Sequence, residues 1–356
     1  MLAVLSVLLC IPARAEVPED AFGAAAVEEA MPRSAREALG EVSAAEPDPE
    51  GALQRLAAYA GAQLKDVLTE VLRPLASIAL LCILAGIGES FDVGGKTGTD
   101  AVALGSCLAI ALIGAEDVRS VLALGTETLA ELSGFSAALL PTLTTAAAAS
   151  GAVGAAGAAY TASALFSDLL LTAAEKLILP VICFFVAMTA AGAVLGEPRL
   201  EGVTKLLRRL ASGLMKGLVL AFTAYLSLTG ILASAADAAA VKTAKAVLSA
   251  ALPVVGKLMA DASEALVAGA NLLRGAVGVF GMLVCLAAMV LPVLRLGLRC
   301  VLFRAATVLC SGFAGQRQSK LISGLADAYG LLLGLVGSAA IMEYLAIISL
   351  VRTVTA

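Results

Sequence analysis

Residues 275–294 read GAVGVFGMLVCLAAMVLPVL, twenty consecutive residues without a charged side chain. A helix of about 20 apolar residues is what crosses the roughly 30 Å hydrocarbon core of a bilayer. Backbone N–H and C=O groups in lipid must be hydrogen-bonded within the protein, so a helix is the expected structure for this stretch. These twenty residues alone predict a helical membrane protein.

Five other stretches are apolar enough to cross a membrane when helix tilt and local bilayer thinning are allowed. The composition agrees, because 60% of the residues are hydrophobic and 15% are charged, against roughly 45–50% and about 25% in soluble domains. We predict an all-α, polytopic membrane protein whose multi-spanning domain covers residues 53–351. The six predicted spans are about 72–88, 101–115, 174–195, 217–236, 275–294 and 328–350.

A seventh apolar stretch, residues 298–313, directly follows the quoted span. It carries Arg299 and Arg304, and charged side chains are costly in the centre of a bilayer. We therefore expect this stretch to lie at the membrane interface or to re-enter the membrane, rather than to span it.

The N-terminal region has a different character from the spans. A short apolar run is followed by Ala13-Arg14-Ala15, an A-x-A pattern typical of a signal peptidase site, so residues 1–15 are predicted to be a signal peptide. Residues 16–52 are acidic and poor in large apolar side chains. Such a segment buries too little surface to offset its chain entropy, and we expect it to be flexible and extracytoplasmic.

The distribution of Lys and Arg predicts the orientation of the chain, because short cytoplasmic loops carry an excess of these residues. With residue 16 outside, six spans place 196–216 and 295–327 in the cytoplasm, and these two loops hold the densest basic clusters. Two long segments, 116–173 and 237–274, then lie outside. Their apolar residues recur at helical spacing between charges, so we expect external amphipathic helices that lie flat on the membrane or pack back against the spans.

An internal parallel repeat is also indicated. Pro141 and Pro180 are 39 residues apart, as are Pro253 and Pro292, and an offset of 112 relates the two pairs. Each unit reads as a span, an external amphipathic segment, a proline and another span. Parallel repeats of this kind occur in transporters.

Polar candidates inside the apolar runs are few. The chain has no histidine, which removes the commonest general base and metal ligand, and we expect no enzyme activity and no cofactor. Gly94-Gly95-Lys96-Thr97 is not a phosphate-binding loop, because that motif requires a glycine five positions before Gly95, where this chain has Ser90. Glu343 lies within an otherwise apolar run, so it needs a partner or a wet cavity and is the candidate intramembrane polar residue.

A second candidate site lies at the mouth of the quoted span. Pro253 and Gly256 interrupt one amphipathic helix, and another begins at Asp261, where Glu264 in its first turn favours the positive helix end. The charges of this segment are expected outside the membrane, within reach of other proteins. The candidate partner-contact residues are Pro253, Gly256, Lys257, Asp261 and Glu264.

At this segment the chain resembles the stage III sporulation protein AE family of endospore-forming bacteria. The residues that carry the resemblance are Pro-Val-Val-Gly-Lys at 253–257, Asp-Ala-Ser-Glu at 261–264, the run at 275–281 and Leu-Pro at 291–292, with supporting matches at 86–92 and 137–141. The likeness extends over about 53–351. No catalytic residues come with it.

The resemblance implies a multipass subunit in the mother-cell membrane that surrounds the forespore. It implies a role as scaffold or conduit in the channel complex that joins the two cells and sustains late forespore development. The implied partners are other proteins of the same sporulation operon, a forespore membrane protein, membrane lipid and a membrane insertase, but no nucleic acid. A secondary transporter for a small solute is the alternative, for which the repeat and Glu343 are the indications.

Overall fold

The computed structural model describes residues 23–40, 42–90, 95–151, 153–197, 199–251, 255–313 and 315–352. Within these ranges every regular element is a helix, which confirms the all-α prediction. The elements are α2 (Ala24–Glu29), α3 (Arg33–Leu39), α4 (Pro49–Ser90), α5 (Gly95–Ala149), α6 (Val153–Ala173), the π-helix η1 (Ala174–Ile178), α7 (Leu179–Leu195), α8 (Leu200–Ala251), α9 (Val255–Cys310) and α10 (Gln316–Arg352).

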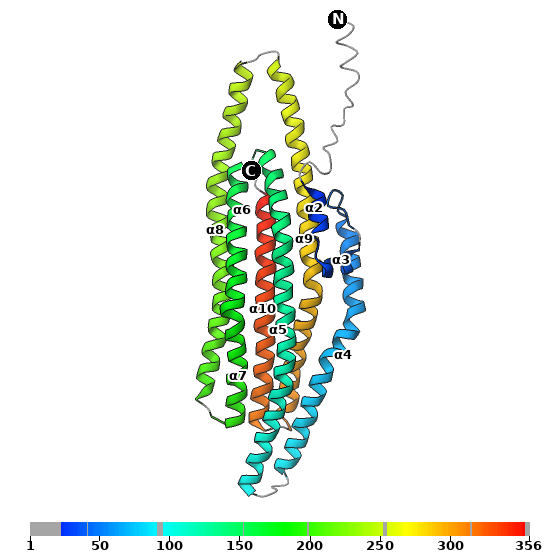
Figure 1. Ribbon diagram of the computed structural model, residues 1–356, viewed down its shortest axis with the longest axis vertical. Helices are drawn as coiled ribbons and strands as arrows, with labels where there is room; N and C mark the ends of the chain where they lie inside the picture. Colours follow the sequence, from blue (N-terminus) through cyan, green and yellow to red (C-terminus); the bar gives the residue numbers. More distant parts are fainter. Residues whose placement is uncertain are drawn as a thin grey trace.

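The long helices form an antiparallel bundle with short connections (Figure 1). Helices α6, η1 and α7 follow one another without a break, and the π-turn lies just before Pro180, whose ring lacks the backbone donor of a regular helix. The connections from α4 to α5, from α7 to α8 and from α9 to α10 all lie at one end of the bundle (Figure 1). The basic clusters of the sequence therefore share one end.

Among the described residues, six helical segments are long and apolar enough to cross a membrane, and each overlaps one predicted span. They are Pro49–Gly88, Gly98–Ala149, Val153–Leu195, Leu200–Leu228, Asn271–Cys310 and Gln316–Val351. The helices far exceed the predicted spans in length. Since a helix rises about 1.5 Å per residue, the 55 residues of α5 extend over about 80 Å, more than twice the hydrocarbon thickness.

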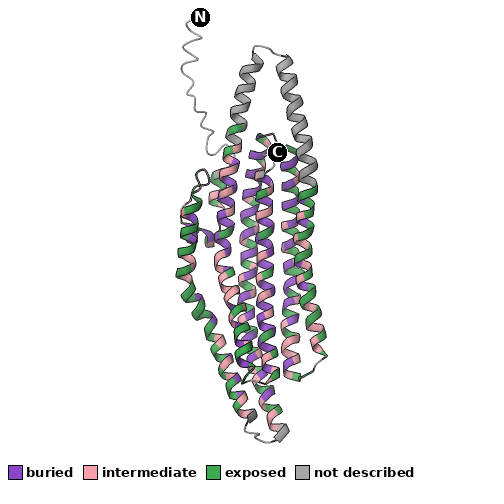
Figure 2. Ribbon diagram, turned by 180° about the vertical axis from the view of Figure 1, so that it is seen from behind, coloured by how far each residue is buried: buried purple, intermediate pink, exposed green. Residues whose placement is uncertain are grey.

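Helix α10 lies at the centre of the bundle. It packs against α5, α6, α7, α8 and α9, and its side chains Tyr329, Leu332, Leu335 and Ile347 are fully buried. Buried residues follow the central helices in Figure 2, whereas α4, at the edge, exposes most of its surface. The interior of the bundle is thus filled by the side chains of α10 and its neighbours.

The described part of the acidic N-terminal segment differs from the expectation of a flexible chain. Helices α2 and α3 pack against α5, α4 and α9, with Val27, Ala35 and Leu39 almost completely buried. The Ser34 hydroxyl donates a hydrogen bond of 2.6 Å to Glu131 on α5. These residues are buried because they pack against the long helices instead of forming a core of their own.

Three other sequence-based expectations can be placed on these helices. Residues 116–149 continue α5 and residues 153–173 form α6, so this segment packs against the other long helices. Residues 298–310 simply continue α9 beyond the 275–294 span, and they form no separate re-entrant segment. The offset of 112 would carry the connection after Ala149 into the interior of α9, so the helix boundaries do not reproduce the proposed repeat.

Candidate functional site

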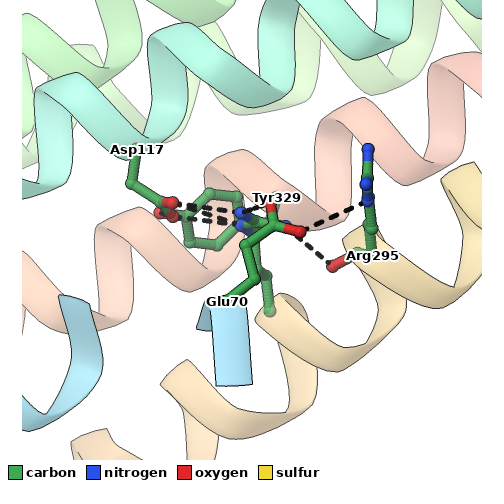
Figure 3. A network of polar contacts seen from close by, with 5 residues as sticks. Glu70, Asp117, Arg295 and Tyr329 are labelled. Atoms are coloured by element: carbon green, nitrogen blue, oxygen red, sulfur yellow. Dashed lines mark hydrogen bonds and ion pairs between the residues drawn. The ribbon is translucent and has the colours of Figure 1, made fainter. Parts of the chain in front are cut away.

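A network of polar side chains, most of them charged, joins four helices of the bundle (Figure 3). Its centre is Arg299 on α9, whose side chain is only 2% exposed. The Arg299 guanidinium donates to Glu70 of α4 at 2.8 Å and to both carboxylate oxygens of Asp117 of α5, with contacts of 3.2–3.3 Å. Arginine suits this position because its planar group presents several donors at once to carboxylates.

Two further residues complete this network, which we call the Arg299 network. The Tyr329 hydroxyl of α10 donates to Asp117 at 2.6 Å, and Arg295, one turn before Arg299, forms an ion pair with Glu70 at 3.4 Å. Two arginines thus face two carboxylates, so the charges balance. A buried charge is tolerated only when it is paired and hydrogen-bonded in this way.

Sequence reasoning did not identify the Arg299 network. Arg299 was assigned to an interfacial or re-entrant segment, and Glu70 and Asp117 were not singled out. One signal was available, because Arg295 and Arg299 are four residues apart and therefore share a helix face. Their acidic partners lie 229 and 182 residues away from Arg299 in the chain, and only the tertiary packing brings them together.

The Arg299 network also bears on the positions of the predicted spans. In the sequence-based topology, Glu70 and Asp117 lie at the outer ends of the spans 72–88 and 101–115, whereas Arg299 lies beyond the inner end of the span 275–294. The structure places these three side chains in contact. The α4–α5 hairpin is therefore shifted along the bundle relative to α9, by roughly one hydrocarbon thickness of about 30 Å.

Figure 1 shows the same shift, since the α4–α5 end projects beyond the α7–α8 and α9–α10 connections. The predicted spans of α4 and α5 therefore do not lie at the same level of the bundle as the predicted span of α9, so the three cannot all cross one flat membrane layer. Hydropathy selects the most apolar twenty residues of each long helix. Helix packing then decides which part of each helix lies at the same level.

Glu343, the predicted intramembrane polar residue, is buried where α10 meets α5 and α6. Its carboxylate accepts a hydrogen bond of 3.1 Å from the Ser167 hydroxyl, and no ion pair among the described residues involves it. A void of about 20 Å³ lies beside it, lined also by Ser133 and Ser167. This volume accommodates one water molecule, so the structure supports a local polar site at Glu343.

The predicted partner-contact residues are only partly described. Pro253 lies outside the described residues, while Gly256, Lys257, Asp261 and Glu264 belong to α9 but have side chains outside the described set. At the end of this segment, Arg274 is buried and donates to the Ser150 hydroxyl at 3.2 Å. Across the described residues, no group of three or more His, Cys, Asp or Glu side chains is arranged to hold a metal ion.

The six long apolar helices and the internally paired charges define a polytopic helical membrane protein. Comparison with known proteins assigns the family: the family model described as stage III sporulation protein AE matches residues 37–353. The chain belongs to this family, which confirms the resemblance seen in the sequence.

A curated relative, stage III sporulation protein AE of Bacillus subtilis (strain 168), is 25% identical over 116 residues. That match covers 32% of this chain and 29% of the relative's length. No solved structure matches.

Proposed function

We propose that this protein is an integral membrane scaffold subunit of the channel complex that joins mother cell and forespore, located in the mother-cell membrane around the forespore. Family membership over residues 37–353 supports a sporulation role, and six apolar helical segments support a multipass membrane protein. Its partners in this proposal are proteins of the same sporulation operon, a forespore membrane protein, and a membrane insertase that assists its insertion.

The central position of α10 carries the choice of a scaffold over a conduit. A conduit formed by one chain needs an open axis, but here the axis is occupied by a helix that packs against five other helical elements. Tyr329, Leu332 and Leu335 fill the space between them. In this proposal any passage forms between subunits of the assembled complex, and this subunit supplies a rigid wall.

A secondary transporter remains the rival function, and Glu343 is the observation that favours it. A transported solute needs a binding cavity, and sites for small molecules occupy about 300–1,000 Å³. The void beside Glu343 is about 20 Å³, which holds a single water molecule rather than a solute. At Glu343, this difference in volume favours the scaffold.

The experiment is a deletion of the gene in its native host, followed by complementation with an affinity-tagged copy. The proposal predicts that engulfment is completed, that late forespore development fails, and that the tagged protein co-purifies with products of its own operon. Normal spore yield in the deletion strain would refute the sporulation role. Purification of the tagged protein without any of these partners would refute the scaffold role.

Single substitutions refine the test. Lys257→Glu reverses a charge in the predicted partner-contact segment, so it should weaken co-purification, whereas Arg209→Glu, on an exposed face of α8, should not. Glu343→Gln removes the charge with almost no change in side-chain volume. If Glu343 takes part in transport, spore yield should fall at unchanged protein level; in a scaffold, spore yield should stay the same.

A further inference from the structure

A cavity of about 400 Å³ opens between α7, α8 and α10, at the end of the bundle where α7 passes into α8. Its volume lies in the range of small-molecule binding sites. One wall is apolar and comes from α7, with Phe185, Met188 and Ala193. The opposite walls, from α8 and α10, carry most of the charged side chains, so the cavity is amphipathic.

Basic residues outnumber acidic residues in the lining. The basic lining residues are Lys205, Arg208, Arg317 and Lys320, and the acidic ones are Glu197, Glu201 and Asp327. Two ion pairs connect α8 with α10, Arg208 to Asp327 at 2.8 Å and Lys320 to Glu201. Lys205 pairs with Glu201 within α8 at 3.9 Å, and Arg317 pairs with Asp100 of α5 at 3.2 Å. Lys205 is 73% exposed and its ion pair is at the limit of contact, so its ammonium group can turn to another anion at little cost.

Two helices also begin at this cavity. Leu200 starts α8 and Gln316 starts α10, and both residues line it. At the start of α8 the Leu200 and Gly202 N–H groups already donate to the Glu197 and Arg199 carbonyl oxygens, so it is the aligned peptide dipoles that make this end positive. Helix starts and basic side chains therefore act together in favour of an anion.

The surroundings of the cavity indicate where such an anion would come from. Phe184, Leu195 and Leu206 lie next to lining residues in the chain and are half to two-thirds exposed. Exposed apolar side chains thus accompany the basic cavity on α7 and α8, which is the combination required by a molecule with an anionic head and an apolar tail. The basic clusters also share the end that is predicted to be cytoplasmic.

We propose that this cavity binds the headgroup of an anionic phospholipid of the inner leaflet. The phosphate lies against Lys205, Arg317 and the start of α8, and the acyl chains lie along the exposed apolar side chains of α7 and α8. Basic pockets between membrane helices on the cytoplasmic side commonly hold such headgroups. The bound lipid fixes α7, α8 and α10 relative to one another, and it ties this end of the subunit to the membrane.

The test uses the full-length protein purified in a neutral detergent, titrated with phosphatidylglycerol or phosphatidylcholine, with lipid adducts counted by native mass spectrometry. Wild type should retain phosphatidylglycerol in preference to phosphatidylcholine. The double variant Lys205→Gln/Arg317→Gln should bind phosphatidylglycerol about thirtyfold more weakly, since each basic residue near a phosphate contributes about 1 kcal/mol. Arg209→Gln, an exposed position on α8 outside the cavity, is the matched control and should bind like wild type.

Three results would overturn the proposal. Equal losses in the double variant and the control would show unspecific attraction to charge. Equal retention of both lipids by wild type would show that the cavity does not select an anion. Binding of soluble glycerol phosphate, without retention of phosphatidylglycerol, would assign the cavity to a soluble anion. If the double variant does not fold, Lys205→Gln alone provides the comparison, with an expected loss of about fivefold.

Discussion

Replacing Arg299 by methionine should destabilise the bundle strongly, because two carboxylates would lose their common partner. Asp117 has a side chain only 10% exposed, so its charge would remain buried without a cation. Breaking a buried ion pair by removing one partner costs about 3–5 kcal/mol. Glu70 adds little to this cost, because its side chain is 40% exposed and keeps an ion pair with Arg295.

A double-mutant cycle separates the ion pair from simple loss of packing. Asp117→Asn alone leaves Arg299 with one carboxylate instead of two, and it keeps an oxygen that can accept the Tyr329 hydrogen bond. The combined variant Arg299→Met/Asp117→Asn has no unpaired charge at either position. We expect it to be more stable than the sum of the single losses predicts, by about 1–3 kcal/mol.

The free energies come from unfolding in mixed micelles by titration with sodium dodecyl sulfate, followed by the loss of helical circular dichroism. The matched control is Arg304→Met, further along α9. This arginine is 59% exposed, so its removal should cost less than about 1 kcal/mol. If the losses of stability in the two single variants add up to the loss in the double variant within about 0.5 kcal/mol, the interaction between Arg299 and Asp117 is refuted.

Three further substitutions test the packing around this site. Tyr329→Phe removes only a hydroxyl that donates to a carboxylate, so unfolding measurements should show a loss of about 1.5–3 kcal/mol. Gly86→Ala would place a methyl group against a backbone carbonyl oxygen of the α9–α10 connection and should cost about 1–3 kcal/mol, whereas Gly61→Ala on the same helix has open space and should be neutral or stabilising. Val27→Asp puts a charge at a fully buried position of α2, so residues 23–48 should become sensitive to protease while the rest of the bundle stays resistant; equal protease sensitivity of this segment in wild type and variant would show that it is not docked.

The helical class and the six spans could be predicted from the sequence because both depend on local composition. A run such as 275–294 is apolar whatever it packs against, and hydropathy detects it. The lengths of the helices were not predicted, since residues such as Glu70, Asp117 and Arg299 end an apolar window without ending the helix. Their charges are accommodated by partners on other helices, and a single sequence gives no information about such partners.

Glu343 shows the opposite case. Its isolation in an apolar run predicts an intramembrane polar residue, and the structure places its side chain beside Ser167 with room for one water molecule. The acidic N-terminal segment shows a third case. Its composition predicts flexibility, yet Val27 and Leu39 are buried against helices that the local sequence does not reveal.

The relative level of α4 and α9 in the bundle can be measured directly with cysteines that the chain already contains. The Cys82 thiol of α4 lies next to the Cys310 thiol at the end of α9. By contrast, Cys82 and Cys285 lie ten residues into the predicted spans 72–88 and 275–294, so spans in register would place these two thiols at one level.

Two variants, each retaining only one of these cysteine pairs, would be oxidised in membranes with copper phenanthroline. A protease site in the α7–α8 connection then shows whether the two halves of the chain remain joined on a non-reducing gel. The shifted packing around Arg299 predicts that Cys82 and Cys310 cross-link and that Cys82 and Cys285 do not. Cross-linking of Cys82 with Cys285, and none with Cys310, would contradict this packing and the contacts of Arg299 with Glu70 and Asp117.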